Sequence, residues 1–577
     1  MKPFLPKEKK ILLVNSFGLP IKITADLLAK KTSDASVYIS YPLGVLTLAA
    51  WCIKDLPEFT VQILDIMLDL HKHKSDKERN PISIEEFIQQ ELNSVGSPPD
   101  IIGISLNFSN GHTSSLLFAK LCKQKWPKCV VVVGGMHATT FSEDIILDRN
   151  IDYLIRGPGD ISFTALIKAL EKNTDIEFVP GVVTDVANIT KMGSVLNDLD
   201  SIPHYPYELL DMEYLVVHES TSPVQKKGTK TGMIFMSRGC PFPCTYCSAA
   251  KVHGKNVFIK SVNRIVDEIQ HLINEYKVTQ INIVDDLFGA NKKHFYELFE
   301  EIDRRNLKFD LSVPAGLAIT IYNEEMIDVL VKHGLKAVNL PLESGSKHVQ
   351  EKIILKRVNI DKGLRLLKHA TSRGVFTGVN IVIGSPGETK EHMEETFEFL
   401  KQAPVDWVTF FIAYPYPQTT MTNILLESGE ITKDQLVEIW DSSTQGFKER
   451  PFDTKEISGK DLYELVYHNN IKINFFNNYN IRNGSCEIII PKLEKIIKNH
   501  EWHVVAISCL ARCHYELGEF NVAISYVKLI TDMVNSEPLS KNMYNKYYDD
   551  IIDFIKPLQV ERSIQSNTPI YKQIDAR

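Results

Sequence analysis

The feature that most constrains this chain is a loop that carries three cysteines in a CxxxCxxC spacing. Cys240, Cys244 and Cys247 follow directly after the apolar run 232–236. Such short spacing lets one loop wrap three thiolates around a single soft-metal centre, and thiolates suit iron–sulfur clusters, zinc or copper(I). A cube-shaped [4Fe–4S] cluster needs four ligands, so three cysteines would leave one iron open to bind a substrate or a cofactor.

Two other interpretations of this loop are a zinc site and three buried core cysteines. Zinc usually takes four protein ligands from paired CxxC units, and no second pair follows at that spacing. Core cysteines rarely stand among residues such as Gly239, Pro241 and Pro243 directly after a strand. The cluster is the interpretation with which the rest of the chain agrees.

The loop resembles the signature of the radical S-adenosylmethionine (SAM) superfamily in its cysteine spacing, in the strand before it and in the aromatic Tyr246 before the third cysteine. In that superfamily the open iron chelates the amino and carboxylate groups of SAM. One electron from the cluster then cleaves SAM to a 5′-deoxyadenosyl radical. The resemblance implies that Cys240, Cys244 and Cys247 are the catalytic cluster ligands and that Tyr246 lies in the SAM site.

Length and composition set the class of protein. A chain of 577 residues is too long for one hydrophobic core, so two to four domains are expected. Hydrophobic content of 44% and charged content of 24% are ordinary for a soluble globular protein. A net charge of −7 without a long basic run argues against nucleic acid as the main partner.

The chain also lacks membrane and export signals. No apolar run reaches ~18 residues, so no transmembrane segment is expected. The first residues lack the apolar core of a signal peptide. Nine cysteines are too few for a disulfide framework in a chain of this length, which favours a reducing cytoplasm.

Short apolar runs alternate with helical patterns through the first third of the chain. The runs that we expect to be buried strands are 11–14, 61–65, 101–105, 130–133 and 153–155. Leu116, Leu117, Ala119 and Leu121 mark a helix over 114–125 between two of them. Alternation of apolar strands with helices implies a parallel sheet covered on both faces. Ligands of such sheets bind beyond the carboxyl ends of the strands.

Glycine-rich turns follow three of these strands. They read GISLN over 103–107, GGMHA over 134–138 and RGPGD over 156–160. Together with 41–44 they resemble the cobalamin-binding domain that precedes many radical SAM domains. The resemblance implies cofactor contacts from Ser105, Leu106, Gly134, Gly135, His137 and Gly157. The third turn departs from the family pattern, because Pro158 and Asp160 replace the usual acidic pair.

The DxHxxG motif, which supplies a cobalt-ligating histidine in other cobalamin proteins, is absent from the sequence. The lower axial position would then hold water, nothing or some other residue. His137 is either a cobalt ligand or a loop histidine that bonds phosphate or backbone. The alternative for the whole domain is a sheet that has lost its cofactor.

Strand–loop–helix units repeat through the middle of the chain. We predict six strands, at 232–237, 280–285, 309–315, 337–343, 376–384 and 407–414. Helices are predicted between them near 259–276, 292–305, 323–334, 361–374 and 389–403. Six such units resemble the open (β/α)6 barrel of radical SAM enzymes, whose sites lie at the carboxyl ends of the strands.

Several residues at these strand ends are candidates for holding SAM or the substrate. The resemblance assigns this role to Asp285, to Glu343 and Ser344, to Lys356 facing the methionine carboxylate, and to Gly384 beneath the adenine. Asp286 and Thr389 are expected to cap the following helices instead. Gln418 replaces a glycine that usually ends the sixth strand, which puts details on the substrate side in doubt.

The pattern becomes helical from about residue 421. The stretch 506–526 resembles one tetratricopeptide-like helical hairpin with its turn at Gly518. Cys486, Cys509 and Cys513 lie in this region, either as ligands of a second cluster or as buried small residues, which we favour. The expected fold class is α/β: an N-terminal Rossmann-like cobalamin-binding sheet (1–175), a linker (176–231), a central partial (β/α)6 radical SAM barrel (232–420) and a C-terminal α-helical region (421–577).

The resemblance as a whole implies a cobalamin-dependent radical SAM enzyme that uses a [4Fe–4S] cluster, SAM and cobalamin. Its expected reaction is methyl transfer to an unactivated carbon, or to phosphorus, of a small molecule, lipid or peptide. An electron donor such as flavodoxin or ferredoxin is expected. The alternatives are a cyclase or rearrangement enzyme with the same cofactors, and a cobalamin-free protein whose N-terminal sheet is a docking module.

Overall fold

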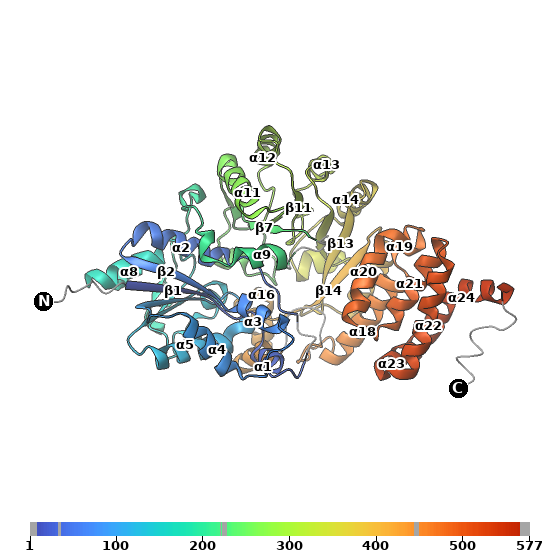
Figure 1. The fold of residues 1–577 in the computed structure, drawn as a ribbon, viewed down its shortest axis with the longest axis horizontal. Coiled ribbons are helices and arrows are strands. Elements are labelled where there is room, and N and C mark those ends of the chain that lie inside the picture. The colour runs from blue at the N-terminus through green and yellow to red at the C-terminus, as the bar shows by residue number, and fades with distance from the viewer. Residues whose placement is uncertain (1–8, 33–35, 220, 222–227, 443–448, 566–577) are drawn as a thin grey trace.

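The computed structural model describes residues 9–32, 36–219, 221, 228–442 and 449–565. Figure 1 shows three parts side by side: an N-terminal sheet with its helices in blue, a central barrel in green and yellow, and a C-terminal group of helices in orange and red. The barrel lies between the other two parts.

The N-terminal sheet has six strands. They are β1 (Lys9–Asn15), β2 (Phe59–Asp65), β3 (Ile101–Ser105), β4 (Val130–Gly134), β5 (Tyr153–Ile155) and β6 (Val182–Val183). The order across the sheet is β2-β1-β3-β4-β5-β6, and all pairs are parallel except β5 with β6. The five predicted strands are confirmed. Ser105 pairs with Gly134 at the carboxyl edge, where the glycine-rich turns begin.

Helices cover both faces of this sheet, as the apolar strands predict. One buried core joins the sheet to α2 (Leu43–Asp55) and α8 (Ser162–Lys172). A second core joins the opposite face to α1 (Ile21–Leu28), α4 (Ile84–Ser94) and α5 (His112–Lys125). Three shorter helices follow strand ends: α3 (Ile66–Ser75), α6 (Met136–Thr140) and α7 (Ser142–Ile145).

The six predicted barrel strands are also confirmed. They are β7 (Thr231–Ile234), β10 (Gln280–Ile283), β11 (Asp310–Ser312), β12 (Ala337–Glu343), β13 (Phe376–Ile383) and β14 (Trp407–Ile412). They form two parallel three-stranded sheets, β11-β10-β7 and β12-β13-β14. A single bridge, Leu311 to Leu335, links the two sheets in the described part of the chain. The outer strands β7 and β14 are not paired there, so the barrel is open.

Five helices follow the barrel strands at the predicted places. They are α11 (Val262–Tyr276), α12 (Lys292–Arg304), α13 (Glu324–Lys332), α14 (Ile360–Ser372) and α15 (Lys390–Gln402). In α11 the buried positions Ile265, Val266, Ile269 and Leu272 form one stripe on the helix, which packs on the strands.

The cysteine loop is closed by a short hairpin of β8 (Ser237–Arg238) and β9 (Phe258–Ile259). Gly239 has φ +100°, and a Cβ there would lie 2.1 Å from the carbonyl oxygen of Asn256, so only glycine fits this turn. The loop ends in α10 (Ala249–Val252), where Ser248 Oγ lies 3.5 Å from Met136 Sδ of α6. The loop therefore contacts the N-terminal sheet domain as well as the barrel.

The segment between sheet and barrel is packed rather than loose. Tyr205 and Tyr207 are buried in the same core as the barrel strands. This core also takes in Tyr41 and Leu46 from the N-terminal domain, and Tyr41 donates a hydrogen bond to the carbonyl of Thr231. Helix α9 (Met212–His218) belongs to the same segment. These contacts hold the sheet against the barrel.

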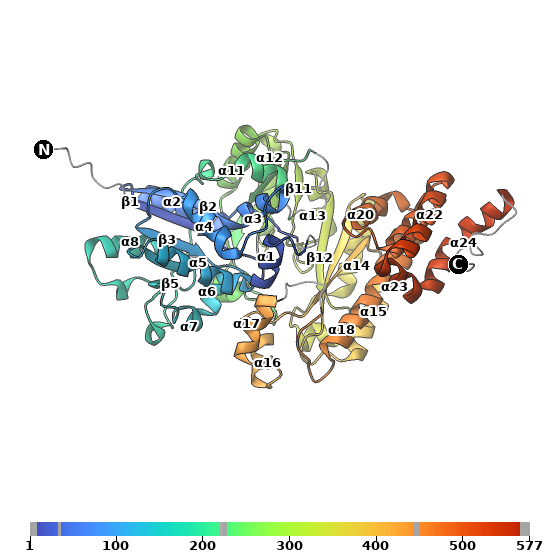
Figure 2. The same cartoon turned by 60° about the horizontal axis from the view of Figure 1, so that its bottom comes forward.

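The predicted C-terminal helical region has two parts in the structure. Helices α16 (Thr420–Glu427) and α17 (Lys433–Ser442) share the core of the N-terminal sheet, where Trp440 is fully buried. Figure 2 shows both helices beside that sheet and away from the remaining C-terminal helices. The sequence pattern could not show this placement, because it depends on contacts with α1 and α5, far away in the chain.

The remaining helices form their own core. They are α18 (Gly459–Ile471), α19 (Tyr479–Arg482), α20 (Cys486–Asn499), α21 (Val504–Glu516), α22 (Phe520–Ser536), α23 (Pro538–Lys546) and α24 (Tyr548–Gln565). The turn between α21 and α22 is at Gly518, with φ +77°. Cys486, Cys509 and Cys513 are fully buried in this core.

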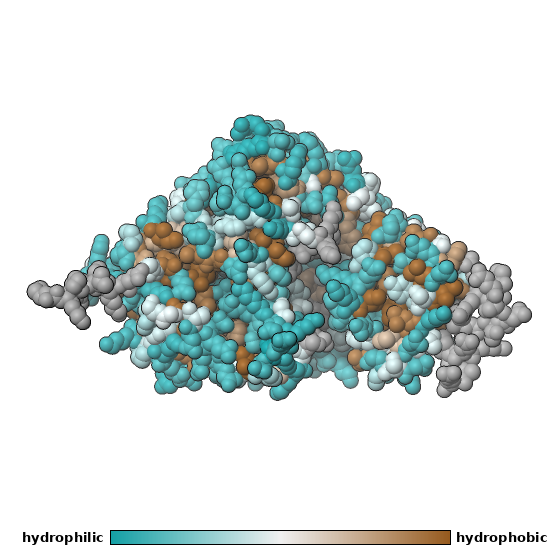
Figure 3. Space-filling view, viewed as in Figure 1, coloured by the Kyte–Doolittle hydropathy of each residue, from teal (hydrophilic) through white to brown (hydrophobic). Residues whose placement is uncertain are grey.

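Figure 3 shows hydrophobic patches on this face of the molecule, one of them over the C-terminal helices, separated by hydrophilic surface. Across the described ranges, none of the helices combines the length and the apolar character that a membrane crossing needs.

Candidate active site

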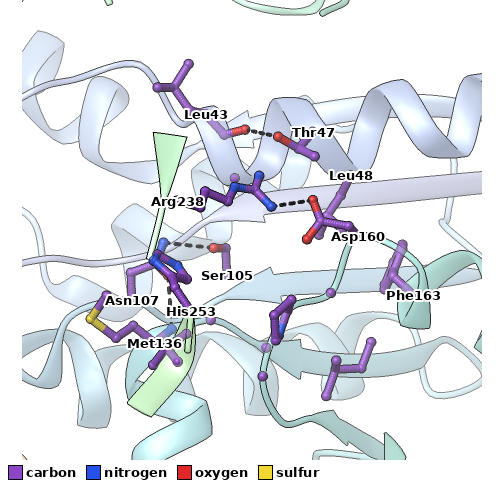
Figure 4. A pocket seen from close by; sticks show the side chains of 18 of the residues that line it. Leu43, Thr47, Leu48, Ser105, Asn107, Met136, Asp160, Phe163, Arg238 and His253 are labelled. Carbon is purple, nitrogen blue, oxygen red and sulfur yellow. Dashed lines mark hydrogen bonds and ion pairs between the residues drawn. The ribbon is translucent and has the colours of Figure 1, made fainter. Parts of the chain in front are cut away.

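A first cavity, of about 320 Å³, lies where the carboxyl edge of the N-terminal sheet faces the barrel. Figure 4 shows its side chains converging from both domains. The sheet side contributes Ser105, Asn107 and the turns after β4 and β5, and α2 contributes Leu43, Gly44, Thr47 and Leu48. The barrel side contributes Phe235, Arg238, Val252, His253 and Asp286.

Two glycines shape the sheet wall of this cavity. Gly135 has φ +107°, and a Cβ there would lie 2.7 Å from the carbonyl oxygen of Leu106, so another residue would be strained. Gly44 differs, because a Cβ built on it meets no protein atom within 4 Å and would project into open space. The lack of a side chain at Gly44 thus leaves room for a bulky ligand.

An ion pair joins the two walls of the first cavity. Asp160, in the third glycine-rich turn, accepts a hydrogen bond from Arg238 Nη1 at 2.7 Å (Figure 4). Arg238 precedes the cysteines by two positions and also lies over the ring of Phe235. The sequence showed Asp160 only as a departure from the family pattern. Its contact with the cysteine loop was not predicted.

A second cavity, of about 210 Å³, lies inside the barrel beside the cysteine loop. All three loop cysteines line it, with Tyr246, Glu343 and Lys356, and apolar side chains such as Leu287, Phe288 and Ile319 complete the wall. Six of the nine cysteines, all in the described part of the chain, are buried, whereas Cys240 and Cys244 are partly exposed and Cys247 is exposed. The loop thiols are thus the accessible ones.

The polar end of the second cavity is a charged pair. Lys356 Nζ lies 2.8 Å from Glu343 Oε1 and 3.3 Å from the hydroxyl of Tyr246. Burial raises the pKa of the Tyr246 hydroxyl, and the Glu343 carboxylate raises it further, so the phenol stays protonated. Glu343 has φ +67°, the left-handed region that a glutamate rarely adopts. The sequence predicted these three residues for one site, and the structure brings them together.

Asp286 is the residue that both cavities share. Its Oδ2 accepts hydrogen bonds from the Gly239 N–H at 3.1 Å and from Nδ1 of His253 at 2.8 Å. The expectation that Asp286 caps the next helix is wrong, because Asn291 caps α12. The expectation for Thr389 is confirmed, since it is the N-cap of α15.

Comparison with known proteins decides the family. The Radical SAM superfamily profile matches residues 234–400, and the B12 binding domain profile matches residues 33–167. An uncharacterised methyltransferase of Pyrococcus horikoshii, PH0819, is 30% identical over 333 residues, which cover 56% of this chain and 68% of that protein. The chain belongs to the cobalamin-binding radical SAM superfamily.

Two more members of this superfamily resemble the chain. Cytidylyl-2-hydroxyethylphosphonate methyltransferase of Streptomyces wedmorensis is 25% identical over 433 residues, 69% of this chain and 80% of that protein. The solved structure of the radical SAM methyltransferase TsrM from Kitasatospora setae, with cobalamin and a [4Fe–4S] cluster bound, has a TM-score of 0.55 at 18% identity. It covers 73% of this chain and 75% of its own, and shows the shared fold.

The match to the radical SAM superfamily implies a [4Fe–4S] cluster and SAM, and the match to the B12 binding domain implies cobalamin. The residues fit these groups. Three accessible thiols on one loop suit three corners of a cluster, beside a cavity that ends in a carboxylate and an ammonium. Thiolates that bind three different irons need not converge on one point. Within the described ranges, no three His, Cys, Asp or Glu side chains are placed around one metal ion.

Not every predicted residue lines a cavity of this radical SAM enzyme. Ser105, Gly134, Gly135 and Gly157 line the first cavity, but Leu106 and His137 do not. The Leu106 side chain is fully buried in the hydrophobic core, behind the turn.

His137 lies on the buried side of α6. Its Nδ1 is 2.9 Å from Ser109 Oγ, its Nε2 is 3.1 Å from Nδ1 of His112, and its ring packs on Phe141 and Trp440. Burial holds the pKa of His137 well below its usual value, so the ring is neutral. The His137 side chain therefore does not reach the first cavity. Neither sequence interpretation of it, as cobalt ligand or as a loop histidine that bonds phosphate or backbone, matches this position.

Asp285, Ser344 and Gly384 do not line the second cavity, although Asp285 and Ser344 directly adjoin the lining residues Asp286 and Glu343 in the chain. Asp285 accepts hydrogen bonds from the N–H of Met236 and the hydroxyl of Ser237, both at 2.6 Å. Burial raises the pKa of Asp285 to about 6. Ser344 Oγ bonds Thr396 Oγ1. These hydrogen bonds hold the loops around the second cavity in place. Contact of Asp285 and Ser344 with SAM stays a prediction.

Gly384 is held from two sides. Its carbonyl accepts a hydrogen bond from Arg450 at 2.7 Å, and its N–H donates to Glu388 Oε2 at 2.7 Å. The guanidinium of Arg450 is buried and also bonds backbone carbonyls at Phe452 and Ile457. Sequence reasoning missed Arg450 because it lies outside every strand-end motif.

Proposed function

We propose that the protein is a cobalamin-dependent radical SAM methyltransferase that methylates an unactivated carbon, or phosphorus, of a small molecule. The observation that carries this proposal is that the two cavities are neighbours that share Asp286 in their walls. A substrate held at this point lies between the site for SAM and the site for cobalamin. The relatives that are named as methyltransferases support the same reaction.

The chain's own residues have separable roles in this reaction. Cys240, Cys244 and Cys247 would hold the cluster, and Lys356 and Glu343 would hold the charged and hydroxyl groups of SAM. Bound there, the cluster and SAM supply a radical that removes a hydrogen atom, and cobalamin supplies a methyl group. The apolar wall around Leu287, Phe288 and Ile319 would exclude water from the radical.

Turnover needs electrons and a reducing environment. We expect a one-electron carrier such as flavodoxin or ferredoxin as the donor. The nine cysteines of the chain are all unpaired, which suits the cytoplasm, where we expect the reaction to occur. A lipid or a peptide remains within the substrate range that we propose, next to a small molecule.

The test uses the full-length protein, reconstituted without oxygen with iron, sulfide and hydroxocobalamin. After desalting, an absorbance spectrum reports corrin and cluster. The protein is then reduced and incubated with [methyl-14C]SAM, and S-adenosylhomocysteine, 5′-deoxyadenosine and the radioactivity in the extracted corrin are counted. A methyltransferase is expected to form S-adenosylhomocysteine and to place label in the corrin before any substrate is added.

Two results would contradict the proposal. Corrin retained without label, with 5′-deoxyadenosine as the SAM product, would indicate a cyclase or rearrangement enzyme. Cluster absorbance without corrin would indicate that the N-terminal sheet serves only as a docking module. The matched control is Cys244→Ala, which is expected to retain corrin but to lose the 5′-deoxyadenosine.

A further inference from the structure

One histidine from the barrel side reaches the first cavity. His253 follows α10 directly, six residues after Cys247. Helix α10 packs on α6 of the N-terminal domain, where Ser248 Oγ lies 3.5 Å from Met136 Sδ. This packing brings the His253 ring beside Asn107 and Met136 at the cavity wall (Figure 4). The sequence offered no reason to single out His253.

The ring of His253 is oriented by a carboxylate. Its Nδ1 lies 2.8 Å from Asp286 Oδ2, and Asp286 is fixed in turn by the Gly239 N–H. Nε2 makes no hydrogen bond with any residue of the described ranges, and the side chain is 30% exposed. A histidine that binds a metal commonly donates its other ring N–H to a carboxylate, which sets the tautomer and the direction of the ring.

The other nitrogen-bearing side chains that line the first cavity already bond other protein groups. Arg238 is paired with Asp160. Asn107 donates to Ser105 Oγ and accepts from the Met136 N–H, and an amide nitrogen is not a metal ligand. Among the described residues that line the first cavity, His253 carries the only imidazole. His137, the histidine of the glycine-rich turn, lies on the far side of α6.

We propose that His253, oriented by Asp286, is the protein nitrogen ligand of cobalt in the resting enzyme, bound from the barrel side. The inference rests on the proposed use of cobalamin. A ligand from this side covers the face of the cofactor that a substrate in the barrel must approach. His253 therefore protects cobalt before turnover and has to leave it when the reaction begins. Asp286, bonded to Gly239 beside Cys240, links this ligand to the cluster loop.

Electron paramagnetic resonance of the cobalt(II) form tests this directly. The unpaired electron of low-spin cobalt(II) lies along the axial direction, so an axial nitrogen splits each cobalt line. The full chain is labelled uniformly with 15N, loaded with unlabelled hydroxocobalamin, and reduced mildly so that the cluster stays in its silent oxidised state. Nitrogen from the protein then gives a doublet, and nitrogen from the cofactor's own base gives a triplet.

The expected result is a doublet that disappears in His253→Ala and weakens in Asp286→Asn. It should persist in the matched control His500→Ala, an exposed histidine of the C-terminal region. Adding unlabelled imidazole to labelled His253→Gly should restore nitrogen splitting as a triplet. This rescue separates loss of the ligand from loss of the fold.

Other outcomes overturn the inference. A triplet in the unmodified enzyme would assign the ligand to the cofactor base, and unsplit lines would indicate water or no ligand. A doublet that survives His253→Ala would assign another residue. In each of these cases corrin absorbance remains, so the proposed function stands. Absence of corrin from the desalted protein would defeat both this inference and the proposed use of cobalamin.

Discussion

Replacing Asp160 by asparagine tests whether the altered third turn still serves the first cavity, the proposed cobalamin site. Asp160 and Arg238 lie 2.7 Å apart and join the sheet wall of the cavity to the cysteine loop. If the pair breaks, part of the free energy of binding cobalamin must be used to fix the third glycine-rich turn against the cysteine loop. The pair should therefore contribute to cobalamin affinity even though it lies within the protein.

The size of this contribution follows from distance and exposure. At 2.7 Å, two unit charges attract by about 6 kcal/mol at an effective dielectric constant of 20, and by roughly 1.5 kcal/mol in water. The Arg238 side chain is 20% exposed and that of Asp160 is 6% exposed, so screening is partial. Close charge pairs at interfaces show coupling energies of about 1.5–7 kcal/mol. We expect about 2 kcal/mol, or roughly 30-fold in the dissociation constant.

The assay is a spectrophotometric titration with hydroxocobalamin of the unmodified protein, Asp160→Asn, Arg238→Gln and the double variant. Each single variant should bind roughly 30-fold more weakly, and the double variant should bind no worse than either. The matched control is Asp55→Asn, because Asp55 pairs with Lys168 at the same 2.7 Å but away from the cavity. Single effects that multiply in the double variant, or an unchanged affinity in Asp160→Asn, would refute the reasoning.

Three further predictions concern single positions. Gly44→Ala should leave the melting temperature unchanged or slightly higher. It should weaken hydroxocobalamin binding about tenfold in the same titration, because the alanine methyl group enters the first cavity. Equal affinity would exclude this cavity as the cobalamin site. Lys356→Met removes the cation beside the buried Glu343 carboxylate and should weaken SAM binding to the reconstituted enzyme about 100-fold in equilibrium dialysis. Unchanged binding would place SAM elsewhere. Burial raises the pKa of Glu388 from 4.5 to about 7, so its stabilising effect is complete below pH 4.5 and is lost as the pH rises through 7. The melting temperature should therefore fall less between pH 5 and pH 8 in Glu388→Gln than in the unmodified protein, and equal falls would contradict the burial argument.

The strands and helices were predictable because their periodicity is local. Apolar runs such as 101–105 and the stripe along α11 follow from burial of one element at a time. Strand β6 was missed because two residues, Val182 and Val183, carry no period. The position of α17 was missed because it depends on Trp440 packing beside His112 and His137, more than 300 residues earlier.

In the site, the path of the backbone was predictable from the sequence, but the directions of the side chains were not. A glycine-rich turn after a strand specifies where the chain reverses, and the structure places Gly134, Gly135 and Gly157 along the first cavity. The turn does not specify which way the next side chains point. Because α6 begins at Met136, directly after the Gly135 turn, its next residue His137 rotates into the core. His253 belongs to no motif, yet the packing of α10 on α6 carries its ring to the cavity. A cavity wall built by contact between two domains cannot be predicted from either domain's sequence alone, because each domain supplies only half of the geometry.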